Sequence, residues 1–304
     1  MEYPFGPVLM SVWADYRRCA GLSRSLKKSL NTWRLLSVFL IVGGGILGLL
    51  AHQLDVCWLD VRWLAAGSAI ALALAVYVTK EALNADMERN WTLARSIAEA
   101  LKTESYKFIT KVAPYNDDDA SRRLLEKSRT VFGDFPLGSA TLIDDDEKVR
   151  NLPHEWLSMD DYLTLRVEEQ IRYYERSAAG NHDKHSRLHK LVVILAGVGV
   201  VLGTLSTAAD GFERASAWIA VIGTISAAIS SHIFSNRYEF QAQSFEVTAR
   251  HLRYVLSEWG ITKEADRESR AGDFINAFES AISVENRRWV AEWQGEQGAS
   301  VNSA

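Results

Sequence analysis

Four apolar stretches constrain the fold of this chain more than any other feature. They cover residues 33–50, 61–78, 191–205 and 218–234. Their only Lys, Arg, Asp or Glu residues are Arg34 and Arg62, each near the edge of its stretch. Each stretch approaches the roughly 20 residues that a helix needs to cross a ~30 Å hydrocarbon core. One such stretch is compatible with a buried helix of a soluble protein, but four in two closely spaced pairs are typical of transmembrane hairpins. We therefore predict an all-α integral membrane protein with four spans.

The distribution of Lys and Arg predicts the orientation of these spans. The two short connections within the hairpins, 51–62 and 206–217, carry one basic residue each, whereas the segments flanking the hairpins carry many. The positive-inside rule then places both termini and the middle of the chain in the cytoplasm, with the spans in the inner membrane. The formal net charge of −4 provides no basic surface for nucleic acid, so we expect no nucleic-acid partner.

The predicted topology also determines what the two cysteines can do. Cys19 falls on the cytoplasmic side and Cys57 in the first outer connection. Because the bilayer separates them, we expect no disulfide between them within one chain.

Each hairpin is followed by a helix with an apolar seam. The seam residues alternate at spacings of four and three, as in a coiled coil, and no Pro or Gly interrupts 79–112 or 235–259. We expect these helices to continue from the spans as cytoplasmic stalks, and we divide the chain into a first hairpin unit (1–112) and a second one (159–293). The seams comprise Met87, Trp91, Ala94, Ala98, Leu101, Ser105, Phe108 and Val112, then Tyr238, Ala242, Phe245, Ala249, Leu252, Leu256 and Trp259.

Residues 113–158 and 294–304 differ from the rest in composition. The first segment contains three Pro and two Gly and two acidic runs, which predicts a solvated linker or a small docking lobe. A calcium loop starting at Asp144 is excluded, because Lys148 and Val149 stand where an oxygen ligand and a Gly are required. The second segment is rich in Gly, Ser and Asn and is predicted to be disordered.

The sequence contains no pattern of a catalytic site. It has no phosphate-binding Gly-rich loop before a helix, no nucleophile elbow and no zinc-protease helix, so we expect neither enzyme activity nor a cofactor or metal. His182, His185 and His189 share one face of the helix that enters the third span. They are candidates for pH sensing, and the alternative is that they simply take the place of Arg and Lys in a basic flank.

Small residues form stripes along three of the spans. In the fourth span, a small face of Ala217, Ala220, Thr224, Ala227 and Ser231 lies opposite a face of isoleucines that includes Ile222 and Ile229. We predict that the isoleucines face lipid and that the small face meets protein or a water-filled lumen. The candidate pore-lining or helix-packing residues are Ala220, Thr224, Ala227, Ser231, Gly44, Gly48, Gly199 and Gly203.

Two helical segments resemble one known family. Residues 162–178, YLTLRVEEQIRYYERSA, are similar to the helix that enters a hairpin of the SLATT group, the SMODS- and SLOG-associating two-transmembrane effectors. Residues 91–108, WTLARSIAEALKTESYKF, are similar to the helix that leaves one. The chain thus resembles two such units in tandem, although Ala242 stands in the second exit helix where the first has Trp91. The resemblance implies a bacterial conflict effector that opens pores in response to a nucleotide-signal sensor, and it implies no catalytic residues.

Two functions follow from these features. The first is an oligomeric pore or channel, gated through the stalks, with membrane lipid and further copies of the chain as partners and with a sensor on a separate cytoplasmic protein or in 113–158. The alternative is a non-conducting membrane scaffold or sensor whose stalks dock a soluble partner.

Overall fold

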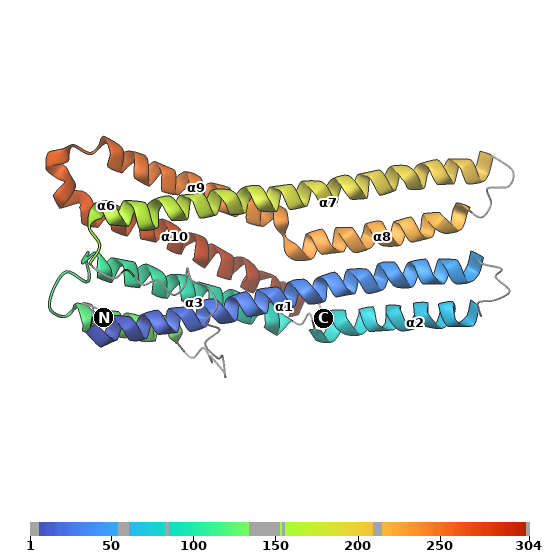
Figure 1. Ribbon diagram of the computed structural model, residues 1–304, viewed down its shortest axis with the longest axis horizontal. Coiled ribbons are helices and arrows are strands. Elements are labelled where there is room, and N and C mark those ends of the chain that lie inside the picture. Colours follow the sequence, from blue (N-terminus) through green and yellow to red (C-terminus); the bar gives the residue numbers. More distant parts are fainter. Residues whose placement is uncertain are drawn as a thin grey trace. The chain divides into compact units, whose positions relative to one another are not determined.

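A computed structural model describes residues 6–53, 61–82, 85–133, 153, 156–208 and 215–301 of the chain, and in these residues all regular structure is helical (Figure 1). The predicted all-α fold is thereby confirmed. The helices are α1 (Gly6–Gln53), α2 (Val61–Tyr77), the π-helical η1 (Val78–Ala82), α3 (Ala85–Ile109), α4 (Ala120–Phe132), α6 (Met159–Tyr162), the π-helical η2 (Leu163–Val167), α7 (Glu168–Ala208), α8 (Ala215–Asn236), α9 (Tyr238–Ile261) and α10 (Glu264–Val301).

The helices form two compact units, and each unit draws on both halves of the chain. The membrane unit comprises 28–85 and 179–242, and the bundle unit comprises 1–27, 86–178 and 243–304. The compact units therefore differ from the two successive hairpin units predicted from the sequence. The reason is that α1 and α7 each contribute residues to both units.

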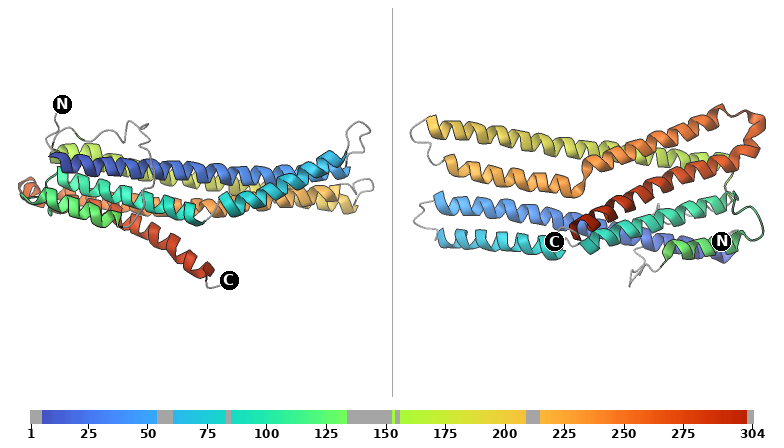
Figure 2. Two further views of the ribbon diagram at one scale, coloured as in Figure 1. Left: turned by 90° about the horizontal axis from the view of Figure 1, so that it is seen from below. Right: turned by 180° about the vertical axis from the view of Figure 1, so that it is seen from behind.

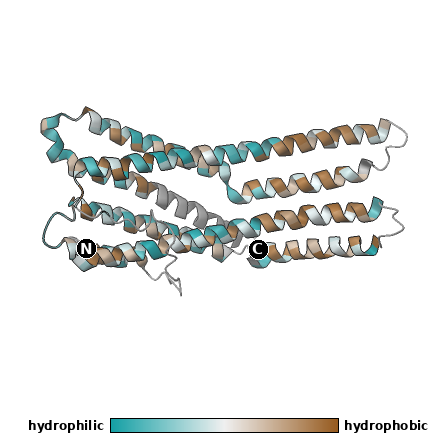
Figure 3. Cartoon of the chain, in the orientation of Figure 1, coloured by the Kyte–Doolittle hydropathy of each residue, from teal (hydrophilic) through white to brown (hydrophobic). Residues whose placement is uncertain are grey.

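The membrane unit contains the four predicted spans. The C-terminal part of α1 lies beside α2, and the C-terminal part of α7 lies beside α8, as two antiparallel hairpins (Figures 1 and 2). These four helices, or their continuations, are long and apolar enough to cross a membrane. Apolar residues are concentrated on α2, on α8 and on the later parts of α1 and α7 (Figure 3). The chain is thus a membrane protein with two transmembrane hairpins, as predicted.

Short polar side chains join the helices of the first hairpin. The Ser68 hydroxyl of α2 donates to the Gly44 carbonyl of α1 at 2.7 Å, and the hydroxyls of Ser37 and Thr79 lie 3.1 Å apart. Such bonds satisfy hydroxyl groups that would otherwise be exposed to lipid. The outer surface of α2 is bulky and apolar, with Ile70 60% and Val76 63% exposed, as suits contact with acyl chains.

The apolar seams that the sequence predicts lie in the bundle unit, except for Tyr238 and Ala242, which belong to the membrane unit. Of the fifteen seam residues, all except Met87, Tyr238 and Leu256 are buried, and Leu101 and Leu252 are fully so. Helix α10 adds Phe278 and Ile282 to the same core. The seams therefore form the interior of a helical bundle. Their burial confirms that apolar residues spaced alternately by four and three mark the buried face of each helix.

The second exit helix does not continue unbroken from its span, which corrects the stalk predicted there. Between α2 and α3 the chain passes through the π-helical η1. Between α8 and α9, Arg237 adopts a left-handed conformation with φ of 47°, and its N–H bonds back to the carbonyls of Ile233 and Phe234. A break without Pro or Gly was not visible in the sequence.

Helix is present in the segment predicted as a linker or small lobe, and in the tail predicted to be disordered. Within 113–158, α4 forms and buries Leu124, because its apolar residues lie on one face. Residues 134–152, which include the Asp144 run, lie outside the described part of the chain. At the other end, α10 extends through 294–301, where Gln, Glu and Ala, all good helix formers, outweigh the glycines.

Candidate functional site

The predicted small-residue positions of α1 and α7 pack within the hairpins. A Cβ atom on Gly44 would lie 2.9 Å from Leu72 Cγ, and one on Gly48 would lie 2.9 Å from Ser68 Oγ. A Cβ atom on Gly199 or Gly203 of α7 would lie 3.8 or 3.6 Å from an isoleucine of α8, which is ordinary van der Waals contact. Close approach between helices thus requires a glycine at Gly44 and Gly48, which is the packing function considered for these positions.

Each of the two predicted faces of α8 has a residue that meets a neighbouring helix. Ile222, expected to face lipid, is half-buried and packs beside Gly199 of α7. Thr224 lies toward the first hairpin, with its methyl 3.8 Å from a Cβ built on Gly45, and its hydroxyl donates to the Ala220 carbonyl at 2.9 Å. A helical wheel separates two faces but does not say which neighbour each face meets.

One face of α8 is not covered by the described residues. Its exposed side chains are small or weakly polar over most of its length, at Ala220, Gly223, Ala227, Ser230 and Ser231. The face ends at Phe234, which is 80% exposed. Three of the four α8 candidates, Ala220, Ala227 and Ser231, therefore share an open face.

A polar contact joins the two hairpins beside the break between α8 and α9. The buried Arg34 of α1 donates from Nη1 to Asn236 Oδ1 at 3.2 Å, although 202 residues separate them. Gln241 of α9 donates to the Asn236 carbonyl at 2.6 Å. These bonds satisfy polar groups exposed by the break at Arg237, which explains how the chain tolerates it.

The candidate pH-sensing histidines lie together on α7. The rings of His185 and His189 are 6.0 Å apart, and His185 Nε2 is 3.9 Å from a carboxylate oxygen of Glu239 on α9. His182 is exposed. Within the described part of the chain, no three His, Cys, Asp or Glu side chains form an arrangement that would hold a metal.

A buried ion pair lies at the centre of the bundle unit. Arg166 of η2 donates from Nε to Glu279 Oε1 at 2.9 Å and from Nη2 to Glu279 Oε2 at 2.8 Å. The side chains are 1% and 0% exposed. Thr103 of α3 and Tyr162 of α6 also donate to the same carboxylate, at 2.8 and 2.9 Å. Four hydrogen bonds thus replace the water that Glu279 loses on burial.

Electrostatics keep this pair charged. Burial alone would raise the pKa of Glu279, but the charge of Arg166 and the hydrogen bonds from Arg166, Thr103 and Tyr162 outweigh it and hold the pKa below its ordinary value. Burial and the Glu279 charge also raise the pKa of the Tyr162 phenol, which remains a donor. The Arg166 guanidinium stacks on the Tyr106 ring at 4.6 Å. The cluster has the features of a structural clamp that joins α3, α6, η2 and α10.

The sequence identified one side of this clamp only. Tyr162 and Arg166 lie in the segment that resembles the SLATT group, whereas Glu279 was not distinguished from the other charges of its helix. The available signal was its position between Phe278 and the apolar Ala281 and Ile282, which places it on the buried face of α10.

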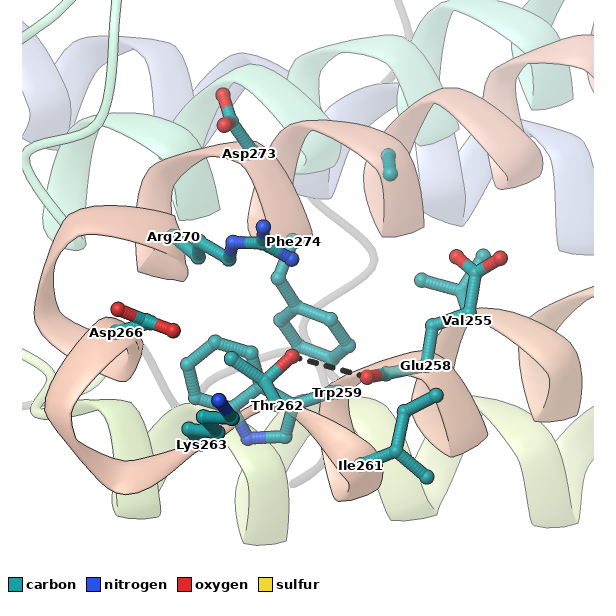
Figure 4. A pocket seen from close by; sticks show the side chains of 11 residues that line it. Val255, Glu258, Trp259, Ile261, Thr262, Lys263, Asp266, Arg270, Asp273 and Phe274 are labelled. Carbon is teal, nitrogen blue, oxygen red and sulfur yellow. Dashed lines mark hydrogen bonds between the residues drawn. The ribbon is translucent and has the colours of Figure 1, made fainter.

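An open pocket of about 850 Å³ lies where α9 turns into α10 (Figure 4). The rings of Trp259 and Phe274, 5.0 Å apart, form its floor. Its rim carries acidic and basic side chains in nearly equal number, including Asp266, Lys263 and Arg270. The nearly balanced charge favours no ionic class of ligand.

The fold and these contacts define the class: a helical membrane protein whose two transmembrane hairpins are accompanied by a bundle clamped by a buried ion pair. Residues 162–289 match the profile of the SMODS and SLOG-associating 2TM effector domain 1, the family that residues 162–178 resemble. Residues 15–123 match a second family, DUF4231, whose function is unknown. No curated protein and no solved structure is significantly similar to the chain.

Proposed function

We propose that this protein is an oligomeric pore-forming or channel-like effector of a bacterial conflict system, located in the inner membrane with both termini in the cytoplasm. The SLATT match supports a membrane-associated effector of this kind. The side of the membrane follows from the excess of Lys and Arg in the segments that flank the hairpins.

The observation that carries the proposal is the open face of α8. Among the exposed residues of α2 and α7 are bulky apolar side chains such as Ile70, Val76 and Val200, the last of which is 70% exposed. The α8 face presents Ala220, Ala227 and Ser231 along most of its length and a bulky side chain, Phe234, only at its end. Small and hydroxyl side chains gain little from lipid but suit close contact with another copy or the wall of an aqueous passage. Several copies around one axis would place this face at the centre.

Gating through the bundle unit is supported by the continuity of α1 and α7. Each is a single helix that contributes to both units, so a rotation or shift imposed on its part in the bundle unit is passed along the same helix. We infer that a cytoplasmic signal acts on the bundle unit and changes the arrangement of the spans.

Conductance of the full-length protein in planar bilayers tests the proposal. We expect currents from the wild type and their loss in Ser231→Leu, because a ring of apolar side chains excludes water from a narrow passage. Ala73→Leu is the matched control: Ala73 is exposed on α2, where a leucine joins an already bulky apolar surface. Native mass spectrometry should show the same oligomer for all three proteins.

Two outcomes would contradict the proposal. Equal currents from Ser231→Leu and the wild type would show that the α8 face does not line the passage. Absence of current across ions, voltages and candidate signals, from a correctly assembled oligomer, would favour the alternative of a non-conducting scaffold that docks a soluble partner.

A further inference from the structure

A cleft of about 350 Å³ lies in the bundle unit between α1, α3 and the start of α7. Each of these helices contributes an aromatic ring to its lining: Tyr16 from α1, Trp91 from α3 and Tyr173 from α7. The volume lies at the lower end of the range of small-molecule sites, and such sites are commonly lined by aromatic side chains. The cleft therefore has the size and the lining that suit a small, flat organic molecule.

Lys102 of α3 lines this cleft and is only partly exposed. Its ammonium nitrogen lies 5.9 Å from the centre of the Tyr16 ring. Within the part of the chain that the structure describes, the Lys102 side chain makes no hydrogen bond and no close ion pair. Lysines taken out of water are normally paired with a carboxylate, and a ring stabilises the charge less than such a pair does. The charged form of Lys102 is thus poorly stabilised by its immediate contacts.

The charges around Lys102 act on its ammonium group in both directions. Burial lowers its pKa most, and the Arg166 guanidinium of η2 lowers the pKa further. Glu99 of α3, Glu279 of α10 and Glu169 of α7 raise the pKa, although Glu279 is already hydrogen-bonded to Arg166. The net result is a pKa below the ordinary value. At neutral pH, a larger fraction of Lys102 is therefore the neutral amine than of a lysine in water.

We propose that this cleft binds a small aromatic aldehyde, which Lys102 joins through an imine bond. Only the neutral amine has the lone pair that attacks a carbonyl carbon, and a lysine desolvated beside another cation is the type that forms such bonds. The carbon–nitrogen double bond forms while the carbonyl oxygen leaves with both amine hydrogens as water, so the step needs no oxidant or reductant. The rings that line the cleft would contact the ring of the aldehyde.

Labelling of the full-length protein with salicylaldehyde tests the site. Borohydride reduces each imine to a stable secondary amine, and peptide mass spectrometry then measures the modification of each lysine. At pH 7.5, Lys102 should be modified at least about fivefold faster than Lys127, which is exposed on α4, because the cleft holds the aldehyde beside the amine. For the same reason, the rate at Lys102 should saturate with aldehyde concentration. The unreactive analogue 2-hydroxybenzyl alcohol should compete with it.

Three variants link the reaction to the cleft. Glu99→Gln removes a charge that favours the ammonium form, so the rate at Lys102 should rise about twofold or more at pH 7.5 and reach its plateau at a lower pH. Lys102→Arg keeps the positive charge and should abolish the saturable reaction. Lys127→Gln removes an exposed lysine outside the cleft and should leave the rate at Lys102 unchanged.

Three results would overturn the proposal: modification of Lys102 no faster than that of Lys127, a rate at Lys102 that rises linearly with aldehyde and is insensitive to the alcohol, or an unchanged rate in Glu99→Gln. The wild-type measurements decide the first two, so the test does not depend on the folding of Lys102→Arg. Labelling is read from peptide masses rather than from currents, so its outcome is independent of the proposed conductance.

Discussion

The guanidinium of Arg166 and the carboxylate of Glu279 meet through two parallel hydrogen bonds in the core of the bundle unit, although 113 residues separate them in the chain. Both residues fall within the SLATT match, which covers 162–289. The segment that carries Tyr162 and Arg166 at the beginning of that domain is thus tied to α10 near its end. Two sequence regions that look unrelated form one structural element of the domain.

Removal of Glu279 should destabilise the bundle unit strongly. Glu279→Ala leaves the Arg166 charge buried without its partner, and loss of one member of a buried pair costs about 3–5 kcal/mol. The exposed pair of Glu246 and Arg250 on α9 provides the control, and Glu246→Gln should cost less than about 1 kcal/mol. Denaturant unfolding followed by circular dichroism measures both. A cost for Glu279→Ala no larger than that of the control would mean that the pair contributes little.

The Glu279 carboxylate should make the free energy of unfolding depend on pH under acidic conditions. An unfolded glutamate titrates near about pH 4.3, and the pKa of Glu279 is lower than this in the folded protein. Its contribution is therefore complete above roughly pH 5 and is lost as the pH falls through the folded pKa. The free energy of unfolding should decline more steeply below pH 5 in the wild type than in Glu279→Gln. If the free energy of unfolding depended on pH in the same way in both proteins, the lowered pKa of Glu279 would be contradicted.

Close approach of α1 and α2 predicts opposite effects at two adjacent glycines. A Cβ atom on Gly44 would lie 2.9 Å from Leu72, whereas one on Gly43 has nothing within 4 Å. Gly44→Ala should therefore destabilise the first hairpin by about 1–3 kcal/mol. Gly43→Ala should be neutral or stabilising by up to about 1 kcal/mol, because alanine favours helix.

Unfolding in mixed micelles of detergent and SDS compares these variants. Leu72→Ala introduced into Gly44→Ala should restore part of the lost stability, since it opens the space that the new methyl group needs. Equal stability of Gly43→Ala and Gly44→Ala would show that the helices are not in contact at this point.

Cys19 should resist thiol reagents until the protein unfolds. Its side chain is fully buried, and burial, aided by the charge of Asp15, raises its pKa to about 12. Since the thiolate is the reactive form, a maleimide should label Cys19 in denaturant but neither in intact cells nor after lysis. Labelling of the folded protein at Cys19 would contradict its burial. Cys19 therefore cannot report the orientation of the chain.

Orientation is better tested at Ser25, which is exposed on α1. In a Cys19→Ala background, Ser25→Cys should react with an impermeant maleimide only after lysis. Cys57, which lies outside the described residues, should react in intact cells. The reverse pattern would invert the proposed topology.

The spans could be predicted from their uninterrupted apolar residues, and the seams from the regular spacing of theirs. Leu101 and Leu252 could be assigned to a core from spacing alone, because burial of an apolar stripe requires only that some partner exists. The partners themselves were not predictable. Glu279 is buried because Arg166 meets it across the bundle, and Ile222 of α8 packs beside Gly199 of α7. Such pairings depend on contacts far apart in sequence, which a local pattern does not encode.

The break at Arg237 gives the two helices of the second hairpin different mechanical properties. Helix α7 enters the hairpin as one uninterrupted rod, whereas the chain leaves it through a single left-handed residue between α8 and α9. A rod transmits torsion about its axis, and a joint of one residue does not, because the hydrogen-bond ladder is interrupted there. Within the second hairpin, torsion is therefore carried along α7, whereas the joint at Arg237 allows α9 to turn relative to α8.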